Sequence, residues 1–330
     1  MIKRLAVLTS GGDSPGMNPA IRSVTRSALS FGVEVVGVYN GYQGLIDEEF
    51  TPLDSLIVSG KNRYSGTFLQ TSRCPEFTTE EGQKKGIANL RKHGIEGLIV
   101  IGGDGSLTGA RAIHRHGYPV VGMPGTIDND IYGTEMGIGV DTALNTIITL
   151  VDMIKATAAS HRRCFVVEVM GRSSGYLALM TSISTGSQVA VIPEYRVNMD
   201  RIVENLHHRT RNKHNNSVII VAEGVCSGGE FMERLRGAGK IEQEVRLTVL
   251  GHVQRGGIPT HFDRLLGARM GEMAVQALVH GETGVMVGQV AGKMQLRNLE
   301  EILGRKKELP ADAIRVARNL GIEFGDPVEM

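Results

Sequence analysis

The chain has 330 residues, and its 36 Lys and Arg nearly balance its 35 Asp and Glu, which leaves a net charge of +1. This balance argues against a nucleic-acid-binding or anionic-membrane surface, which would need an excess of basic residues. The hydrophobic fraction of 41% and the charged fraction of 22% are typical of a globular protein and exclude wholesale disorder. At about 150 residues per domain, the length predicts two domains, each with its own core.

The cysteines and the apolar stretches bear on location. Cys74, Cys164 and Cys226 lie far apart and form no CxxC pair, which excludes a disulfide framework and a thiolate zinc site and is typical of a reducing cytoplasm. The start of the chain lacks the long apolar core of a signal peptide. The longest uncharged stretch, 173–193, is too polar to cross a bilayer, and we interpret it as a helix, a glycine stop and a buried strand.

The first half of the chain alternates short apolar runs with segments of helical spacing. Strands are predicted at 4–8, 33–38, 98–101 and 119–123, and helices at 15–31, 78–94, 106–116 and 141–160. Thr78, followed three residues later by Glu81, predicts a capping box, and Asp141 is predicted to cap the long helix.

The second half continues this alternation. Strands are predicted at 165–169, 189–192, 218–222, 245–250 and 285–290, with helices between them and a long helix at 262–279. Continuous apolar strands that alternate with helices indicate an α/β fold with parallel sheets covered on both faces. No linker rich in Pro and Ser separates the domains, and the stretch 137–139 is the best candidate for a boundary.

The residues that directly follow the predicted strands are the candidates for chemistry, because ligands of open parallel sheets bind beyond the carboxyl ends of the strands. Six such segments carry glycine, acidic or arginine residues: Thr9–Asp13, Gly102–Ser106, Pro124–Asp130, Met170–Arg172, Glu223–Gly224 and Gly251–Gly257. We expect all six to point to one side of the molecule.

The two glycine turns suit a phosphate group. Backbone N–H groups at a helix start bind anions, and the missing side chains let a phosphate approach closely. Neither turn is a Walker loop or a G-x-G-x-x-G motif, and a lone Gly-Gly pair is more often a tight strand-to-helix turn. Asp104, inside the second turn, would oppose a phosphate unless a cation lay between them, so it indicates Mg²⁺.

The acidic and arginine residues complete a set for phosphoryl transfer. Asp128 and Asp130 are either part of an Asx-rich turn or a general base with a second acid. Arg172 and Arg255 could neutralise phosphoryl oxygens, although either one alone is more often part of a surface ion pair. His252 alone is more often structural. Together with the glycine turns, these residues predict phosphoryl transfer.

Five segments resemble the signature segments of the bacterial ATP-dependent 6-phosphofructokinases, in that family's order: TSGGDSPGMN, GGDGS, PGTIDND, VEVMGR and VLGHVQRGG. The resemblance implies transfer of the γ-phosphoryl group of MgATP to the 1-hydroxyl of fructose 6-phosphate, which gives fructose 1,6-bisphosphate and ADP in glycolysis. The stretch 306–330 departs from the family, and the resemblance implies nothing for it.

The resemblance also implies an architecture. We expect a cytoplasmic homotetramer whose subunits have two αβα sandwich domains with mostly parallel sheets and an active site in the cleft between them. The larger, ATP-binding domain would be formed by 1–138 and about 252–303. The smaller, fructose-6-phosphate-binding domain would be formed by 139–251 and about 304–330.

The implied catalytic residues lie within the third and fourth of these segments. Asp128 would take the proton from the sugar hydroxyl, with Thr126 and Asp130 beside it, and Arg172 would stabilise charge in the transition state. Asp104 would hold Mg²⁺. The ATP site would comprise Gly12, Arg73, Cys74, Gly103, Asp104, Gly105, Ser106 and Gly109, with Cys74 in place of the aromatic residue that is frequent in the family.

The implied sugar site draws on two subunits. One subunit would supply Thr126, Asp128, Met170, Gly171, Arg172, Glu223, His252 and Arg255. Arg163 and Arg246 would reach the sugar phosphate of a neighbouring subunit.

A second site, for the effectors ADP and phosphoenolpyruvate, is implied in weakened form. Its remaining basic residues would be Arg22, Arg26, Lys155 and Lys213, and Arg22 and Arg26 are four apart on one helix face. The family's usual residues are replaced at five positions: Ser55, Lys155, Gln188, Asn212 and His214. Fewer charge-assisted contacts predict a weak response to both effectors.

Two alternatives remain open. A pyrophosphate-dependent relative would carry Asp after GGD and Lys for the Gly of PGTIDND, whereas this chain has Gly105 and Gly125. A non-catalytic sugar-phosphate sensor on the same fold would be expected to lose the base or the metal-binding acid, whereas Asp104, Asp128 and Arg172 are all present.

Overall fold

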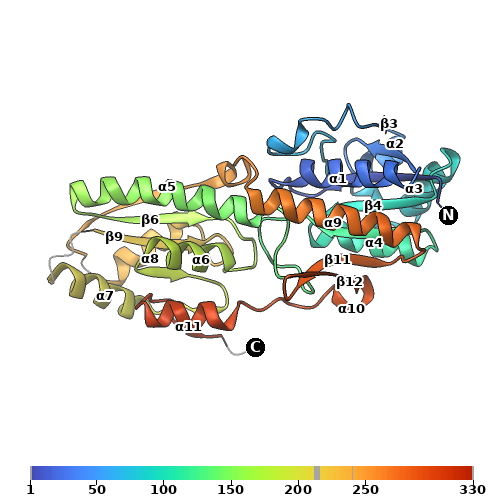
Figure 1. Cartoon of the computed structure of the whole chain (residues 1–330). Coiled ribbons are helices and arrows are strands. Elements are labelled where there is room, and N and C mark those ends of the chain that lie inside the picture. The colour runs from blue at the N-terminus through green and yellow to red at the C-terminus, as the bar shows by residue number, and fades with distance from the viewer. Residues whose placement is uncertain (1, 212–215, 240, 329–330) are drawn as a thin grey trace. The chain divides into compact units, whose positions relative to one another are not determined.

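The computed structural model describes residues 2–211, 216–239 and 241–328. The chain forms two compact units, whose elements are labelled in Figure 1. Unit 1 comprises Met1–Ile127, Ile131–Thr142 and Arg255–Lys307, and unit 2 comprises Asp128–Asp130, Ala143–Gln254 and Glu308–Met330. Each unit is therefore assembled from segments that are far apart in the sequence.

Unit 1 contains a seven-stranded sheet. Its strands, from one edge to the other, are β12 (Lys293–Asn298), β11 (Val285–Val290), β5 (Val120–Pro124), β4 (Gly97–Gly102), β1 (Arg4–Ser10), β2 (Glu34–Val38) and β3 (Phe50–Leu53). The five inner strands are parallel, and the edge strands β3 and β12 pair antiparallel with their neighbours. The apolar runs of β4 and β5 are fully buried, as expected for the centre of a parallel sheet.

Helices cover both faces of this sheet (Figure 1). Leu5 and Val7 of β1 pack in one core cluster with α1 (Met17–Ser30) and α9 (His261–Val279). Ala6 and Leu8, which point to the other face, pack in a second cluster. The helices of this second face are α2 (Tyr42–Asp47), α3 (Glu80–Lys92), α4 (Asp104–Arg115) and α10 (Leu299–Ile302). Two short helices, η1 (Lys61–Arg63) and η2 (Glu76–Thr78), complete the unit.

Unit 2 contains a four-stranded parallel sheet in the order β10 (Glu244–Val249), β6 (Arg163–Val169), β9 (Ser217–Ala222), β7 (Val189–Val191). Its helices are α5 (Val140–His161), α6 (Tyr176–Thr185), α7 (Met199–Arg211), α8 (Gly228–Ala238) and α11 (Ala311–Asn319). Apolar side chains of α7 and α8 pack on β6, β7 and β9, with Phe231 among the fully buried ones. A separate two-stranded sheet pairs β8 (Tyr195–Arg196) with β13 (Asp326–Pro327).

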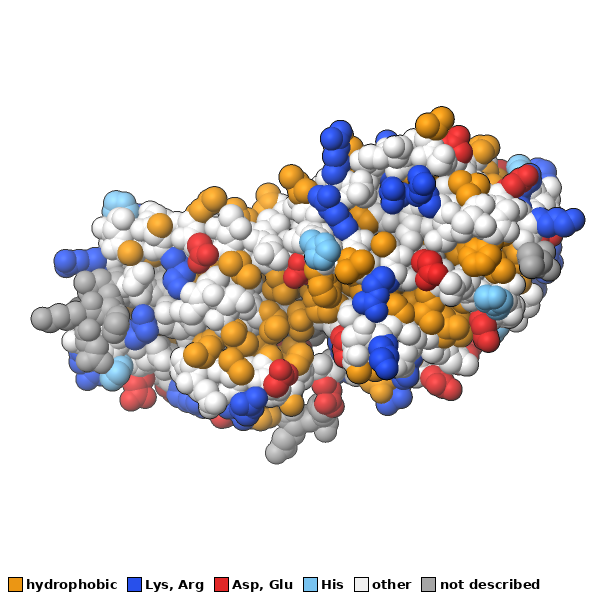
Figure 2. Space-filling view, in the orientation of Figure 1, with side chains coloured by type: hydrophobic (Ala, Val, Ile, Leu, Met, Phe, Trp, Pro, Cys, Tyr) orange, Lys and Arg blue, Asp and Glu red, His pale blue; other side chains and the backbone are white. Residues whose placement is uncertain are grey.

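The predicted α/β class with mostly parallel sheets is confirmed, and most predicted elements lie within a few residues of the observed ones. The stretch 173–193 forms α6, a left-handed Gly186 and β7, as predicted. Among the described residues, no helix is long and apolar enough to span a membrane. On the face shown in Figure 2, Lys and Arg side chains are interspersed with Asp and Glu, in keeping with the balanced charge.

Two local predictions are wrong. The cap of α3 is Thr79, whose Oγ1 accepts from Gly82 N at 3.1 Å, whereas the Thr78 hydroxyl donates to Pro75 O. Asp141 lies inside α5, which already begins at Val140. The strand predicted at 245–250 is confirmed as β10, which is an edge strand with mostly exposed or half-exposed side chains.

Candidate active site

The two glycine turns of unit 1 meet beside Ser106. A Cβ atom placed on Gly11, after β1, would lie 3.2 Å from Ser106 Oγ, and one placed on Gly102 would lie 2.5 Å from it. A Cβ atom on Gly103 would lie 3.7 Å from Cβ of Thr126, which follows β5. The carboxyl ends of three neighbouring strands are therefore brought together, and a side chain on Gly102 would collide with its surroundings, whereas one on Gly11 would be tight.

Arg255 lies on the first of these turns. Its Nη1 donates to Asp13 O at 2.6 Å, and a Cβ atom on Gly12 would lie only 2.8 Å from the same nitrogen. Gly12 is therefore needed for the guanidinium to approach the backbone. The contact places a permanent positive charge beside a turn whose geometry suits a phosphate.

Two stacked aromatic rings, Tyr42 and Phe77, support the second glycine turn, Gly102–Ser106. The Tyr42 hydroxyl donates to Ser106 O at 2.6 Å, and a Cβ atom on Gly109 would lie 2.7 Å from that hydroxyl. The Tyr42 ring stacks on Phe77 with 4.2 Å between ring centroids, and Phe77 N donates to Cys74 O at 3.2 Å. Burial raises the pKa of Tyr42, so its hydroxyl stays protonated and remains a donor. Sequence reasoning missed both rings.

The segment that carries Arg73 and Cys74 is attached to the first turn. Thr71 Oγ1 donates to Gly11 O at 2.8 Å, and the Arg73 side chain is exposed. Burial raises the pKa of the half-buried Cys74 thiol, which keeps it in the neutral form. Five predicted nucleotide-site residues, Gly12, Gly103, Ser106, Gly109 and Cys74, thus lie on the turns or on the rings that support them.

Asp104 and Gly105 open the helix α4 in an exposed position. A Cβ atom on Gly105 would have no neighbour within 4 Å, so the space beside this turn is open. Among the described residues, no three His, Cys, Asp or Glu side chains gather to form a metal cage. A single exposed carboxylate next to a phosphate-binding turn fits Mg²⁺ that completes its coordination with nucleotide oxygens and water.

The Asp128–Asp130 turn has strained backbone. Asn129, at its centre, is buried and has a φ of 52°, a left-handed conformation that is uncommon for residues other than glycine. Thr126 and Asp128 are buried, with 6% and 9% of their surface exposed, and Asp130 is half-buried. Such strain persists only where the surroundings enforce it, and it concentrates at functional sites.

Unit 2 has its own set of residues at the carboxyl ends of its strands. The turn Met170–Arg172 follows β6, Glu223 follows β9, and the exposed His252 lies in the short helix η3 (Gly251–Arg255) that follows β10. Arg172 N donates to Glu223 Oε1 at 3.0 Å, which links the first two of these segments. The structure therefore brings together four of the predicted sugar-site residues and the His252 loop.

Gln254 holds that loop in place, and sequence reasoning did not single it out. Its side chain is fully buried, its Oε1 accepts from Met170 N at 3.0 Å, and its Nε2 donates to Gly251 O at 2.9 Å. Both ends of one amide are therefore used to join two turns. The residue stands inside the quoted segment VLGHVQRGG, so the motif contained it, but only the fold shows its partners.

Arg163 and Arg246 lie together, but away from the Met170–Arg172 turn. The Glu244 carboxylate accepts from Arg163 Nε at 2.6 Å and also pairs with Arg246. The hydrogen bond from Arg163 lowers the pKa of Glu244, so the carboxylate stays charged. Arg163 begins β6 and Val169 ends it, so six steps of about 3.3 Å place Arg163 roughly 20 Å from the start of the Met170 turn. One small sugar phosphate cannot contact both within a single subunit.

The six segments were expected to point to one side of the molecule. They belong to two different units, so this expectation stays a prediction. Within unit 1 the structure brings the glycine turns, Thr126 and Arg255 together. Within unit 2 it brings the Met170–Arg172 turn, Glu223 and the His252 loop together.

The candidate effector residues are placed as follows. Arg22 and Arg26 both lie on α1, and the Lys155 ammonium donates to Thr185 O. Gln188 Oε1 accepts from Val218 N at 2.7 Å, and its Nε2 donates to Gly186 O at 2.9 Å, so its amide is engaged beside the sheet of unit 2. Ser55 is exposed. The remaining three positions, Asn212, Lys213 and His214, lie outside the described residues.

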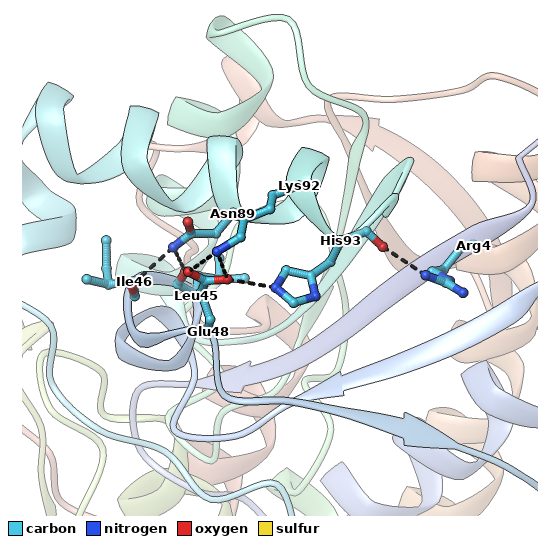
Figure 3. Close-up of polar contacts among 7 residues, drawn as sticks. All are labelled: Arg4, Leu45, Ile46, Glu48, Asn89, Lys92 and His93. Atoms are coloured by element: carbon cyan, nitrogen blue, oxygen red, sulfur yellow. Dashed lines mark hydrogen bonds and ion pairs between the residues drawn. The ribbon is translucent and has the colours of Figure 1, made fainter.

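A cavity of about 380 Å³ that the sequence did not predict lies against β2 and β3. It extends along β3, from Arg4 and Glu34, which begin their strands, to Phe50, which pairs with Val38 at the end of β2. Two of its lining residues contact each other, with 2.7 Å between Glu48 Oε2 and His93 Nε2, and Glu48 also accepts from Lys92 at 2.8 Å (Figure 3). Near the end of α3, Asn89 Nδ2 donates to the carbonyls of Leu45 and Ile46 in α2, so this cluster joins α2 to α3.

Comparisons with known proteins agree on one family. The model of the phosphofructokinase family matches residues 4–278. The ATP-dependent 6-phosphofructokinase of Halalkalibacterium halodurans is 50% identical over 321 residues, which cover 97% of this chain and 100% of that protein. The enzyme of the same name from Bacillus subtilis is 49% identical over 323 residues, with the same two coverages.

Solved structures give the same answer for the fold. Phosphofructokinase from Saccharomyces cerevisiae superposes with a TM-score of 0.87 at 37% identity, over 98% of this chain and 48% of that chain. A pyrophosphate-dependent phosphofructokinase from Marinobacter aquaeolei superposes with a TM-score of 0.84 over 100% of this chain and 94% of that chain. At 20% identity, this second likeness shows the fold alone.

Proposed function

The chain belongs to the phosphofructokinase family and acts as an ATP-dependent 6-phosphofructokinase, and from this premise we propose which of its residues carry out the reaction. The γ-phosphoryl group of ATP moves to the 1-hydroxyl of fructose 6-phosphate, which gives fructose 1,6-bisphosphate and ADP. The observation that carries the assignment is identity near one half along the whole chain with enzymes of this name.

ATP is the donor, and unit 1 is its binding unit. The Gly11–Asp13 and Gly102–Ser106 turns offer backbone N–H groups, and their glycines carry no side chains that would block the phosphates. Open space beside Gly105 leaves room for the adenosine side of the nucleotide. Gly125, where the pyrophosphate-dependent branch has Lys, offers no cation to a pyrophosphate donor.

Asp128 is the general base. Its carboxylate accepts the proton of the sugar 1-hydroxyl while that oxygen forms the new bond to the γ-phosphorus, and the bond from the γ-phosphorus to the bridging oxygen of ADP breaks. Burial and the strained Asn129 beside it support a fixed orientation of this side chain. Thr126 and Asp130 flank the base and orient the acceptor.

Two positive groups are proposed to act on the phosphoryl oxygens, and a separate set of residues holds the sugar. Arg172, held in a left-handed conformation with a φ of 54°, stabilises the charge that spreads over the transferring group. Asp104 would hold Mg²⁺, which would shield the charge of the donor phosphates. Met170, Gly171, Glu223, His252 and Arg255 hold fructose 6-phosphate, and unit 2 is its main binding unit.

The sugar site is shared between subunits of a homotetramer. The separation of roughly 20 Å between Arg163 and the Met170 turn supports this, because each group needs a different copy to reach one phosphate. Glu244 holds both arginines in place until a sugar phosphate replaces it as their anionic partner. Three free cysteines, with no disulfide among the described residues, suit a cytoplasmic enzyme.

The test is a coupled assay of fructose 6-phosphate phosphorylation with ATP or pyrophosphate as donor. We expect turnover with ATP and none above background with pyrophosphate. Turnover with pyrophosphate alone would favour the pyrophosphate-dependent alternative, and tight binding of the sugar phosphate without turnover would favour a sensor. A Mg²⁺ titration, read by nucleotide binding in wild type and Asp104→Asn, tests the metal site separately.

A further inference from the structure

Glu194, which none of the motifs contains, holds one end of the Arg172 turn. Gly175 N, at the start of α6, donates to Glu194 Oε1 at 2.9 Å and to Oε2 at 3.2 Å. A Cβ atom on Gly175 would lie 2.5 Å from Oε2, so this approach depends on the glycine. A carboxylate that accepts from the first N–H groups of a helix is a favourable cap.

The turn between Arg172 and Gly175 is short and strained. Ser174 N donates to Gly171 O at 2.9 Å, and Gly171 has a φ of 135° that favours glycine. Arg172 has a left-handed backbone, and its N–H donates to Glu223 at 3.0 Å. Arg172 is therefore held from one side by Glu223 and from the other, through Ser174 and Gly175, by Glu194.

The end of the chain in turn holds the backbone around Glu194. Glu323 N donates to Gln188 O at 3.0 Å, and Ala190 N donates to Glu323 O at 2.9 Å, so this segment pairs with the outer edge of β7. Val328 N donates to Glu194 O at 3.2 Å, and β13 pairs with β8 directly after Glu194.

Side chains reinforce this pairing. Phe324 is buried and lies edge-on to the Tyr195 ring, with 4.9 Å between centroids. Arg201 of α7 donates to Glu323 and to Asp326, each at 3.0 Å. Glu323, Phe324 and Asp326 belong to the stretch 306–330, to which the sequence analysis assigned no role.

We propose that Glu194 is a positioning residue for Arg172, and that the C-terminal segment 322–328 keeps Glu194 in place. The proposal rests on the proposed role of Arg172 in stabilising the transferring phosphoryl group. A strained backbone relaxes when one of its restraints is removed, so loss of Glu194 lets Arg172 leave its left-handed conformation. The loss affects the chemical step and the sugar, and it leaves nucleotide binding on the turns of unit 1 unchanged.

The first test compares Glu194→Ala with Glu194→Gln. We expect Glu194→Ala to lower kcat by about 10- to 100-fold, the range in which a misplaced transition-state contact acts, with the KM for ATP unchanged. Glu194→Gln keeps one carbonyl oxygen that can accept from Gly175 N and should recover most of kcat. Ser227→Ala, which removes the cap of α8 in the same unit, is the matched control: it should lower Tm without lowering kcat.

Arg172→Ala separates the proposal from the function on which it rests. If Arg172→Ala keeps kcat, the proposed role of Arg172 is wrong. If Arg172→Ala loses kcat, Glu194→Ala should have no further effect on kcat in that background, because both changes remove one contact. The positioning role would be overturned if Glu194→Ala left kcat unchanged. It would also be overturned if Glu194→Ala lowered kcat by the same factor in the Arg172→Ala background as in wild type.

The C-terminal segment is tested by Glu323→Pro, which keeps the chain length and removes the N–H that donates to Gln188 O. We expect the same fall in kcat with an unchanged KM for ATP. Arg201→Ala, which removes two side-chain bonds to the segment and leaves its backbone intact, should give a smaller effect in the same direction. Wild-type kcat in a folded Glu323→Pro variant would rule out this part of the proposal.

Discussion

Asp128 is the residue on which the proposed chemistry depends most. Asp128→Asn keeps the size of the side chain and removes the proton acceptor, so kcat should fall by about 10²–10⁴-fold. Fructose 6-phosphate should still bind, because the Met170–Arg172 turn, Glu223 and His252 lie on other strands. Steady-state kinetics and sugar binding by calorimetry measure the two quantities separately. A variant that retains more than about a tenth of wild-type kcat would reject Asp128 as the base.

Gly105 tests the position of the nucleotide. Gly105→Asp places bulk and negative charge in the open space beside the turn, so the KM for ATP should rise steeply. Gly105→Ala is the matched control, because a methyl group there meets no atom within 4 Å in the protein. If Gly105→Asp leaves the KM for ATP unchanged, the adenosine side of ATP does not pass this glycine.

A switch of donor would need more than that one change. Gly125→Lys is the second substitution that the pyrophosphate-dependent pattern requires, but a Cβ atom there would lie 3.0 Å from Ile101 Cγ2 and 3.1 Å from Met17 Cε. Both contacts are tight, so the core around α1 has to adjust. We expect the double variant to gain at most weak turnover with pyrophosphate and to lose stability, which thermal unfolding would show.

Single residues were predictable where a motif carries them. Asp104, Asp128 and Arg172 follow predicted strands, so the rule about strand ends was enough to select them. Tyr42, Gln254 and Glu244 were not predictable, because each acts through partners that only the fold brings close. The one sequence signal for the Tyr42–Phe77 pair is rarity: aromatic residues make up only 5% of the chain, so each of them is a candidate for a specific contact.

At the scale of elements, one carboxylate joins the starts of two helices. Asp263, near the start of α9, accepts from Gly139 N at 2.8 Å and from Thr142 N at 2.7 Å at the start of α5. Thr260 Oγ1 donates back to Asp141 at 2.6 Å. Burial raises the pKa of Asp263 from 3.8 to about 6, against the opposing effect of its hydrogen bonds.

This pKa gives Asp263 a distinct pH signature. Between the unfolded pKa of 3.8 and the folded pKa of about 6, the folded state binds more protons, so this group's contribution to stability falls as pH rises through that window. A shift of about two units corresponds to roughly 3 kcal/mol. In Asp263→Asn, the free energy of unfolding should not show this fall with pH. It should also be lower by about 1–3 kcal/mol, because the amide N–H₂ group faces backbone donors. Urea unfolding at several pH values checks both, and parallel pH profiles would contradict the assignment.

The helices and strands themselves were largely predictable from periodicity, but their ends were not. Thr78 and Thr79 both suit an N-cap, and which one caps α3 depends on the preceding turn η2, where the Thr78 hydroxyl bonds Pro75 O. The start of α5 is held by Asp263, more than a hundred residues later, so no local rule could find it. Likewise, the apolar pattern of β10 does not tell an edge strand from an inner one.

The shared sugar site is tested on the whole assembly. Asp128→Asn and Arg246→Ser are each expected to be nearly inactive alone, because each lacks one of two residues that a site needs. Reassembled mixtures should contain some sites with both residues intact, so their activity should exceed that of either parent treated in the same way. No recovery in verified mixed tetramers would contradict a site built from two subunits.

The response to effectors is the second property of the assembly. The neutral Gln188 amide is engaged by Val218 N and Gly186 O, and the Lys155 ammonium donates to Thr185 O, so both side chains already have partners within the protein. Saturation with fructose 6-phosphate should therefore shift little with millimolar ADP or phosphoenolpyruvate. A strong sigmoidal shift with phosphoenolpyruvate, reversed by ADP, would show that these substitutions do not matter.

The composition of the units sets an order of events during synthesis. Unit 1 ends its second segment at Thr142 and resumes at Arg255, and α1 packs against α9 of the later segment, where Ser23 Oγ donates to Ala268 O at 2.6 Å. At about 5–20 residues per second, a ribosome needs roughly 8–33 seconds to travel from Thr142 to Lys307. Until then, the apolar face of α1 has no covering helix and β5 lacks its neighbour β11. A nascent chain released before Arg255 would leave that face uncovered, so unit 1 completes its core only after its segment Arg255–Lys307 has been made.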